Sequence, residues 1–214
     1  MGVLDKAVRV LAAVADRPLD LGGLVAATGL PRATAHRLAV ALEAHRLLRR
    51  DADGRFAPGL GLAALGRAAA AAFPVAEAAA PALAALRDAT GESVQLYVRD
   101  GDRRVCLASL ESPHGLRTIV PLGAALPLGL GSAGRLLGGD EIALRRGWAQ
   151  SVGEREPGVA SVSAPVFGPG GGIVAAVGIS GPIDRLGRDP GSTHADAVVA
   201  AARAIEAAAG LRAP

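Results

Sequence analysis

The feature that most constrains the fold is a pair of short helices near the N-terminus, joined by a glycine turn and followed by a hairpin. The first helix is predicted over Leu21–Thr28, with Asp20 at its N-cap, where its side chain can accept hydrogen bonds from the first turn. Gly29 follows, and glycine often ends a helix because it tolerates positive φ. Pro31 then opens the second helix, which runs to about Ala44. This arrangement predicts a helix-turn-helix.

The segments on either side of the pair extend this prediction. A preceding helix is expected over Val3–Ala15, before Pro18 stops it. After the pair, Leu47–Arg50 and Arg55–Phe56 flank an Asp-Gly turn, which between short apolar and basic runs is a strong hairpin signal. A hairpin directly after the second helix is a wing. Residues 1–62 are therefore predicted to form a winged helix-turn-helix domain.

The second helix has an apolar stripe for the core, predicted at Leu38, Ala41 and Leu42, and polar residues elsewhere. Arginine can read guanine in the major groove, and threonine can contact a thymine methyl group or a phosphate. Arginines on a wing suit phosphates or the minor groove. The residues predicted to contact double-stranded DNA are Arg32, Thr34, His36, Arg37, Arg49, Arg50 and Arg55.

The charge of the chain is unevenly divided. Residues 1–62 carry nine Lys or Arg and six Asp or Glu, whereas residues 63–214 carry fourteen of each. The whole excess of +3 therefore lies in the first part. A basic small domain joined to a neutral larger one suits a DNA-binding domain joined to a sensor domain.

The remainder, residues 63–214, is predicted to form a linker helix and a second domain. Helices are expected over Leu60–Ala72 and Val75–Thr90, after which alternating apolar residues indicate strands. Helices that bracket mostly antiparallel strands indicate an α+β domain. The expected strands are 94–98, 105–108, 117–120, 147–152, 159–166 and 173–180, with helices at 132–137 and 195–209.

Several classes of protein are disfavoured. The single cysteine, Cys106, excludes an intramolecular disulfide and a multi-cysteine metal site, and it fits a reducing cytoplasm. The N-terminus lacks the pattern of a signal peptide, and the apolar stretches are too short or too interrupted to span a membrane. No phosphate loop or HExxH motif occurs, so we expect no metal and no cofactor.

Ordered motifs along the chain resemble the IclR (isocitrate-lyase regulator) family. They include LVAATGLPRATAHRL at 24–38, GRFAPG at 54–59, GSAGR at 131–135, EPGVASVSAPV at 156–166 and GISGP at 178–182. The resemblance implies a transcription regulator with a winged helix, a linker helix and a GAF-like α/β effector-binding domain. It also implies a homodimer or tetramer on a pseudo-palindromic operator. The stretch 146–159 is most similar to an actinobacterial branch that regulates amino-acid metabolism, including leucine biosynthesis.

The resemblance also implies an effector pocket, lined by Ser132, Ala133, Ser151, Ser161, Gly178 and Ser180. Small residues let backbone N–H groups approach an anion, and a helix N-terminus at Ser132 would favour a carboxylate. Serine hydroxyls can donate to a carboxylate or accept from an amine, so the effector is expected to be a carboxylate or an amino acid. The alternative is that these are ordinary strand and turn residues.

Two rival functions and one departure from the family remain. Cys106 could be a nucleophile with His114 or His194 as its base, although a lone strand cysteine is usually a small core residue. The winged helix could instead bind protein.

The segment 138–146 is much shorter than the largely helical stretch usual in the family. That difference weakens any transfer of ligand identity or tetramer geometry.

Overall fold

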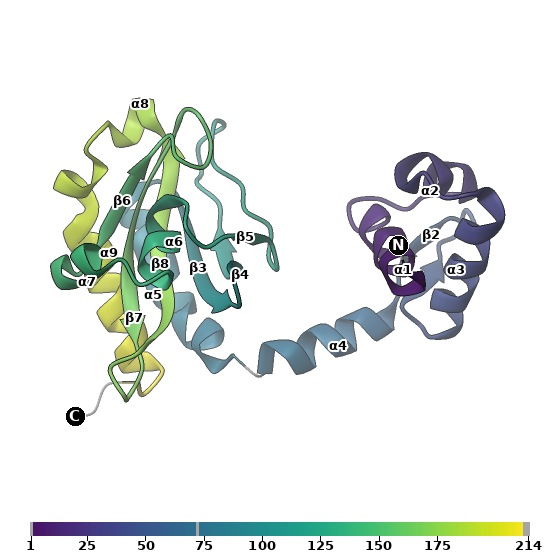
Figure 1. Ribbon diagram of the computed structural model, residues 1–214, viewed down its shortest axis with the longest axis horizontal. Helices are drawn as coiled ribbons and strands as arrows, with labels where there is room; N and C mark the ends of the chain where they lie inside the picture. The colour runs from purple at the N-terminus through teal and green to yellow at the C-terminus, as the bar shows by residue number, and fades with distance from the viewer. Residues whose placement is uncertain (1, 72, 212–214) are drawn as a thin grey trace. The chain divides into compact units, whose positions relative to one another are not determined.

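The computed structural model describes residues 2–71 and 73–211. Contacts divide the chain into two compact units, Met1–Ala72 and Phe73–Pro214 (Figure 1). Each unit has its own hydrophobic core.

The N-terminal unit is a winged helix-turn-helix, as predicted. The cap of α2 is confirmed, since Asp20 accepts a hydrogen bond from the backbone N–H of Gly23 at 2.7 Å. Gly29 ends this helix at φ +63°. Pro31 is the N-cap of α3 rather than its first residue. The elements are α1 (Val3–Ala13), α2 (Leu21–Thr28), α3 (Arg32–Ala44), β1 (Leu48–Arg50), β2 (Phe56–Pro58) and α4 (Leu60–Ala71).

The core of this unit corrects one detail of the predicted apolar stripe. Ala41 is exposed, whereas Ala35, Ala39 and Leu42 are buried. These three residues follow the i, i+4, i+7 spacing of one helix face, and Ala41 falls outside it. The wing is tied to the body of the domain at Phe56, whose backbone N–H and C=O exchange hydrogen bonds with Leu19 at 2.8 and 2.9 Å.

The C-terminal unit is an α/β domain around one antiparallel sheet, in the order β5-β4-β3-β8-β7-β6. The helices are α5 (Pro74–Thr90), α6 (Gly131–Leu137), α7 (Glu141–Arg146), α8 (Ile183–Leu186) and α9 (Pro190–Ala208). The strands are β3 (Ser93–Asp100), β4 (Arg103–Leu110), β5 (Ala125–Pro127), β6 (Ala149–Val152), β7 (Val159–Phe167) and β8 (Ile173–Pro182).

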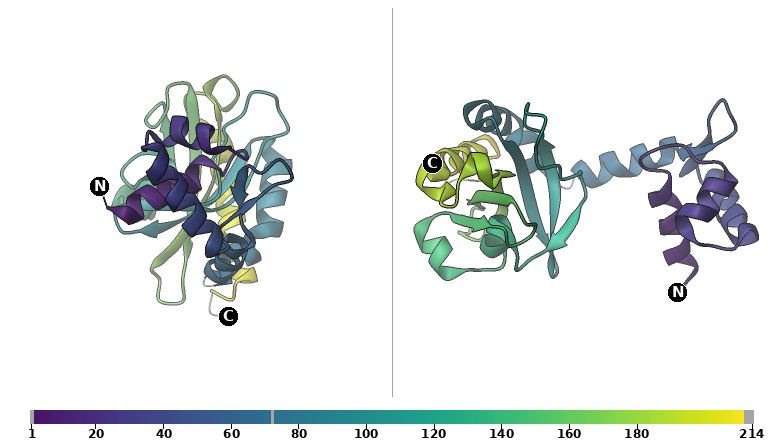
Figure 2. Two further views of the ribbon diagram at one scale, coloured as in Figure 1. Left: turned by 90° about the vertical axis from the view of Figure 1, so that its right-hand side faces the viewer. Right: turned by 90° about the horizontal axis from the view of Figure 1, so that it is seen from above.

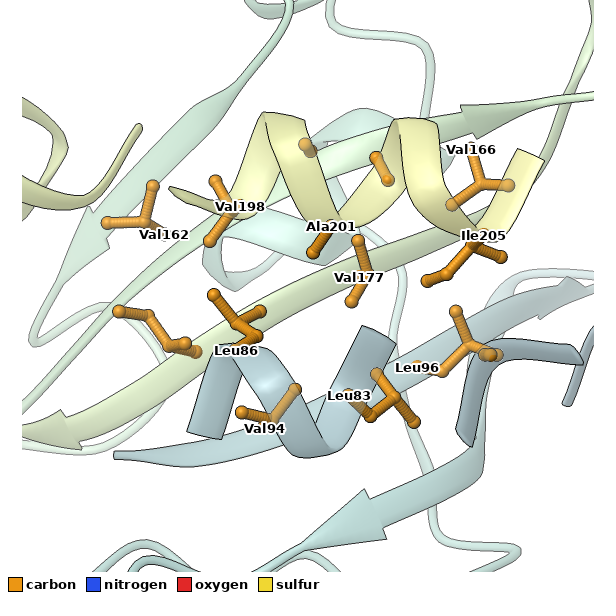
Figure 3. Close-up of a cluster of buried hydrophobic side chains, with 14 of the residues drawn as sticks. Leu83, Leu86, Val94, Leu96, Val162, Val166, Val177, Val198, Ala201 and Ile205 are labelled. Carbon is orange, nitrogen blue, oxygen red and sulfur yellow. The ribbon is translucent and has the colours of Figure 1, made fainter. Parts of the chain in front are cut away.

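The two faces of this sheet differ because side chains alternate along each strand. One face packs on α5 and α9, which lie side by side (Figures 1 and 2). Figure 3 shows its aliphatic core, where Leu83 and Leu86 of α5 approach Val94 and Leu96 of β3. The other face is covered by α6. Polar residues of several strands gather on that second face, which positions the candidate site.

One predicted strand is wrong. Residues 117–120 are irregular, and Arg117 is held by a 2.6 Å ion pair with Glu111. The edge of β4 is paired instead by Ala125–Pro127, a strand that the sequence analysis did not predict. The helix α7 was also not predicted. Asp140 caps it by accepting from the N–H groups of Ile142 and Ala143, both at 3.1 Å.

No single helix of the described residues is long and apolar enough to cross a membrane. The segments Leu60–Ala69 and Pro74–Thr90, which are separated by a short break, meet the length and composition criteria only when taken together.

Candidate functional site

The exposed face of α3 carries the first group of predicted residues. Arg32, His36 and Arg37 are exposed, and Thr34 is half-buried. Arg32 and His36 are four residues apart and therefore lie on one face of the helix, and Arg37 follows on the adjoining part of its exposed side. Within the described residues, Arg32 and Arg37 make no hydrogen bond or ion pair. Their guanidinium donors are therefore available to a partner.

The arginines of the wing are less uniform than the prediction assumed. Arg49 is exposed and has no ion-pair partner within the described residues. Arg50 donates to the carbonyl of Gly54 at 2.9 Å and lies 3.4 Å from Glu43, with its guanidinium over the Phe56 ring at 3.7 Å. These contacts stabilise the hairpin, so only part of the charge of Arg50 remains available to a ligand.

Arg55 is held by two acidic residues of the turn. Its guanidinium lies 2.9 Å from Asp51 and 2.6 Å from Asp53. Burial tends to raise the pKa of Asp51, but hydrogen bonds from the backbone and side chain of Arg55 outweigh it and hold that pKa below its usual value. Because both carboxylates offset the arginine, Arg55 offers less net positive charge than Arg49.

The second group of predicted residues gathers around a pocket between α6 and the sheet. Ser132 and Ala133 come from α6, Ser151 from β6, Ser161 from β7 and Ser180 from β8, and all five line the pocket. The space that a water-sized sphere can enter is only about 30 Å³, well below the volume of ordinary small-ligand sites, so a ligand would require the lining side chains to move apart. The lining residues are Gln95, Tyr97, Arg104, Gly131, Ser132, Ala133, Ser151, Arg155, Glu156, Val159, Ser161, Ser163, Ile179 and Ser180.

Hydroxyl groups meet at the centre of this pocket. The Ser132 Oγ lies 2.8 Å from the Oγ atoms of both Ser161 and Ser163. At the start of α6, the backbone N–H of Gly131 donates to a carboxylate oxygen of Glu154 at 3.1 Å. This end of α6 was expected to attract the anion of a ligand. The Gly131 N–H is occupied by an anion that belongs to the chain itself.

Gly178 lies beside the pocket and is not among its lining residues. It is paired with Ser163 across β7 and β8, and a Cβ there would collide with the Ser163 hydroxyl and the Val162 carbonyl. The glycine is thus needed for the close approach of the two strands.

Sequence reasoning missed the charged and aromatic part of the pocket, namely Gln95, Tyr97, Arg104, Arg155 and Glu156. A signal for Arg104 was present. The predicted strand began at Val105, but extending it by one residue places Arg104 on the same face as Cys106. Burial raises the pKa of Tyr97 to about 12, so its phenol is neutral in the pocket.

Cys106 has the properties of a core residue. It is 1% exposed, and its Sγ atom donates to the carbonyl of Ala108 at 3.4 Å. Burial raises the pKa of its thiol to about 11, which opposes formation of the nucleophilic thiolate. Of the described residues, neither His114 nor His194 is its hydrogen-bond partner. This environment gives no support to a catalytic thiol.

Comparison with known proteins agrees with this architecture. The family model of the IclR helix-turn-helix domain matches residues 3–52, and that of the bacterial transcriptional regulator IclR C-terminal domain matches 67–138 and 141–207. The interruption, at residues 139–140, falls within the shortened segment noted above.

Individual relatives extend over most of the chain. The transcriptional repressor AllR of Escherichia coli K12 is 28% identical over 86% of this chain and 80% of its own length. An IclR-family protein from Rhodococcus sp. is 30% identical, covers 98% of this chain and 94% of that one, and gives a TM-score of 0.61. An IclR homologue from Microbacterium hydrocarbonoxydans, solved with 4-hydroxybenzoate, is 20% identical with a TM-score of 0.80, covering 99% and 100%.

The two family models together cover most of the chain, in the same order as the two structural units. AllR is named a transcriptional repressor, and KipR of Bacillus subtilis, 26% identical over 76% of this chain, is named a transcriptional regulator. The chain belongs to the IclR family of DNA-binding transcription regulators.

Proposed function

We propose that this protein binds a specific operator in double-stranded DNA and that a small-molecule effector modulates its affinity for that operator. The observation that carries the proposal is the exposed basic side of α3 next to a wing with Arg49, because neither the arginines on α3 nor Arg49 have an ion-pair partner within residues 2–71 and 73–211. We place the boundary between the DNA-binding and effector-binding domains near residue 62, with α4 as the linker helix.

In this proposal α3 is the recognition helix. Arg32, Thr34, His36 and Arg37 approach base edges in the major groove, and Arg49, Arg50 and Arg55 approach the phosphates. The three arginines of the wing differ in the charge that they can offer to a phosphate. Arg49 keeps its full charge, whereas Arg50 and Arg55 form ion pairs with neighbouring carboxylates.

The operator is proposed to be pseudo-palindromic and to be bound by a homodimer or tetramer. Symmetric half-sites one helical turn apart, or a multiple of it, require two copies of α3. Exposed apolar side chains on α1 support self-association, because Val3 and Leu4 are 73% exposed and Val8 is 54% exposed.

The effector is proposed to bind in the pocket beneath α6, with Ser132, Ala133, Ser151, Ser161 and Ser180 in contact and Gly178 keeping the strands close. The 4-hydroxybenzoate bound by the Microbacterium homologue supports a carboxylate as ligand. An amino acid is the other candidate. Effector binding would alter operator affinity by favouring one arrangement of the DNA-binding domains.

The biological role that we propose is repression of amino-acid metabolism genes in the cytoplasm, with the leucine pathway as the first target to examine. The name of AllR, a transcriptional repressor, supports repression rather than activation. The resemblance of residues 146–159 supports the class of target.

Fluorescence anisotropy with labelled duplexes tests the DNA-binding part. The full chain should bind DNA from upstream of its own gene more tightly than a scrambled duplex, with an affinity that falls steeply with salt. The double variant Arg32→Glu, Arg37→Glu should abolish the preference. The double variant Arg103→Glu, Arg145→Glu, which reverses the same number of charges at two exposed residues of the C-terminal unit, is the matched control.

The protein-interaction alternative makes the opposite prediction. If the double charge reversal leaves affinity for the duplex unchanged, α3 is not the DNA-binding surface. A chain that never distinguishes its upstream region from scrambled DNA would also contradict a role as an operator-specific regulator.

A further inference from the structure

The side of α3 that faces away from the protein core is mostly apolar. The core side carries Ala35, Ala39 and Leu42. An α-helix has about 3.6 residues per turn, so the residues on the opposite side follow from their spacing. The exposed residues there are Ala33, Arg37, Val40, Ala41 and Ala44. Arg32 and His36 border this side rather than occupy its centre. The most outward part of α3 is thus an apolar surface that contains one arginine.

Val40 is the largest apolar residue on this side, and the packing of the domain does not account for it. The residue is 42% exposed, so it gains little from the core. Valine is also a poorer helix former than alanine, because its β-branched side chain loses rotamer freedom. Val40 lies one turn after Arg37, on the same side of the helix. The two side chains therefore offer one apolar and one charged contact to the same partner.

The major groove of DNA presents the groups that match such a pair of contacts. Thymine carries a C5 methyl group there, which the other three bases lack, and guanine presents its N7 and O6 acceptors to an arginine. Three residues along a helix span about 4.5 Å, and base pairs are about 3.4 Å apart, so the two contacts would fall on neighbouring base pairs. The small side chains of Ala33 and Ala44 let the helix lie close to the base edges.

We propose that Val40 determines part of the operator sequence by contacting the C5 methyl group of a thymine, next to a guanine contacted by Arg37. The inference deepens the proposed function and rests on it, because α3 must be the recognition helix. The methyl contact supplies selectivity that charge alone does not, since phosphates are the same at every sequence. A contact between Val40 and a second copy of this chain is the competing explanation, and the variants distinguish the two.

Uracil in place of thymine tests the contact, because it removes only the methyl group and keeps the base pair. A tightly bound duplex is first selected from a random-sequence library with the full chain. Each thymine is then replaced by uracil, one position of the half-site at a time, and affinity is measured by fluorescence anisotropy. We expect one thymine position, next to a guanine, at which the replacement weakens binding about fourfold per methyl group. A duplex with no sensitive thymine would overturn the proposal.

The variant Val40→Ala assigns the effect to this side chain. It should bind the thymine and uracil duplexes equally well at the sensitive position, which is the coupling that a double-mutant cycle measures. Alanine is the better helix former, so the folding of α3 is not at risk. Val174→Ala is the matched control, because Val174 is a similarly exposed valine, at 39%, in the C-terminal unit. If Val40→Ala stays sensitive to uracil, or instead changes the oligomeric state measured by sedimentation, the assignment is wrong.

Failure of this inference and failure of the proposed function are distinguishable. If charge reversal of α3 abolishes the preference for the selected duplex over a scrambled one, but no uracil weakens binding, the regulator function stands and the role of Val40 falls. If the library yields no preferred sequence, both fall, because α3 then recognises no operator.

Discussion

Arginine serves opposite purposes in the two units of this molecule. On α3, Arg32 and Arg37 are exposed and have no ion-pair partner among the residues that the structure describes, which is inexpensive in water and leaves the charge free for a large anionic partner. Beneath α6, Arg104 is 3% exposed and has no carboxylate partner in the described part of the chain, which is costly for a buried charge. The difference shows that exposure decides whether an unpaired charge is ordinary or informative.

The wing adds an intermediate case. Arg55 is exposed like Arg37, but Asp51 and Asp53 hold it in ion pairs. A basic residue in a pattern is therefore only a candidate, and its neighbours in space decide how much charge it offers. The predictions below test this ranking of sites, beginning with the largest expected effect.

The largest effect is expected for the residue that makes room for the buried arginine. Gly134→Ala should lower the free energy of unfolding of the C-terminal unit by about 2–3 kcal/mol, because the new methyl group would collide with the guanidinium and with the Leu128 carbonyl. Denaturant titration measures the change. Gly170→Ala is the control, since a Cβ there has no neighbour within 4 Å. Equal stabilities of the two variants would show that Arg104 can move aside at little cost.

The second prediction concerns the buried thiol of Cys106, a weak acid that should stay neutral, whereas the buried guanidinium of Arg104 stays charged. The pKa of the Cys106 thiol is raised to about 11 from an ordinary value of 9.0, so at pH 8 its thiolate fraction is roughly 100-fold reduced. Native protein should react with a disulfide reagent at least about 100-fold more slowly than the chain unfolded in guanidinium chloride. Because the raised pKa still lies well above 8, the rate should rise as pH is increased toward 11. Equal native and unfolded rates at pH 8 would contradict the burial.

The exposed arginines should differ according to their ion pairs. Arg37→Ala should weaken operator binding by about 1–3 kcal/mol, roughly 5- to 150-fold. Arg55→Ala should weaken it by less than about threefold, because two carboxylates already offset that charge. Anisotropy titrations at one salt concentration compare them. If the Arg55 variant loses as much affinity as the Arg37 variant, the ion pairs of the wing must open on DNA.

The smallest change in stability is expected for the N-cap of α2, the first helix of the helix-turn-helix. Asp20→Ala should destabilise the N-terminal unit by about 1 kcal/mol, because the N–H of Gly23 loses its acceptor. Asp16→Ala removes the same charge from an exposed position with no such bond and serves as the control. Thermal unfolding followed by circular dichroism measures both. A similar melting temperature for the two variants would mean that α2 does not depend on its cap.

The N-terminal unit was largely predictable because its signals are local. The cap at Asp20, the positive φ of Gly29 and the Asp-Gly turn each act within a few residues, so the bounds of α2 were predicted correctly. The seven predicted DNA-contacting residues lie on one helix or on the hairpin that follows it for the same reason. Their roles stay predictions until an operator complex is measured.

The pocket was only partly predictable because its parts come from distant segments. Serines of α6, β6, β7 and β8 were identified through family resemblance, and they do meet at one place. Arg104 and Gln95 were missed, and residues 117–120 were wrongly predicted to be a strand, although Ala125–Pro127 takes that edge. Alternation along the strand could have placed Arg104 on the face of Cys106, but the choice of edge strand and the partners of a buried charge are not encoded in local periodicity.

The sequence by itself determined the winged helix, the order of the two domains and the family, because short-range caps, turns and ordered motifs carry that information. Only the tertiary structure decided which arginines are paired, which are free and which one is buried. Those properties depend on side chains that lie far apart in the chain and meet only when the sheet and α6 pack together.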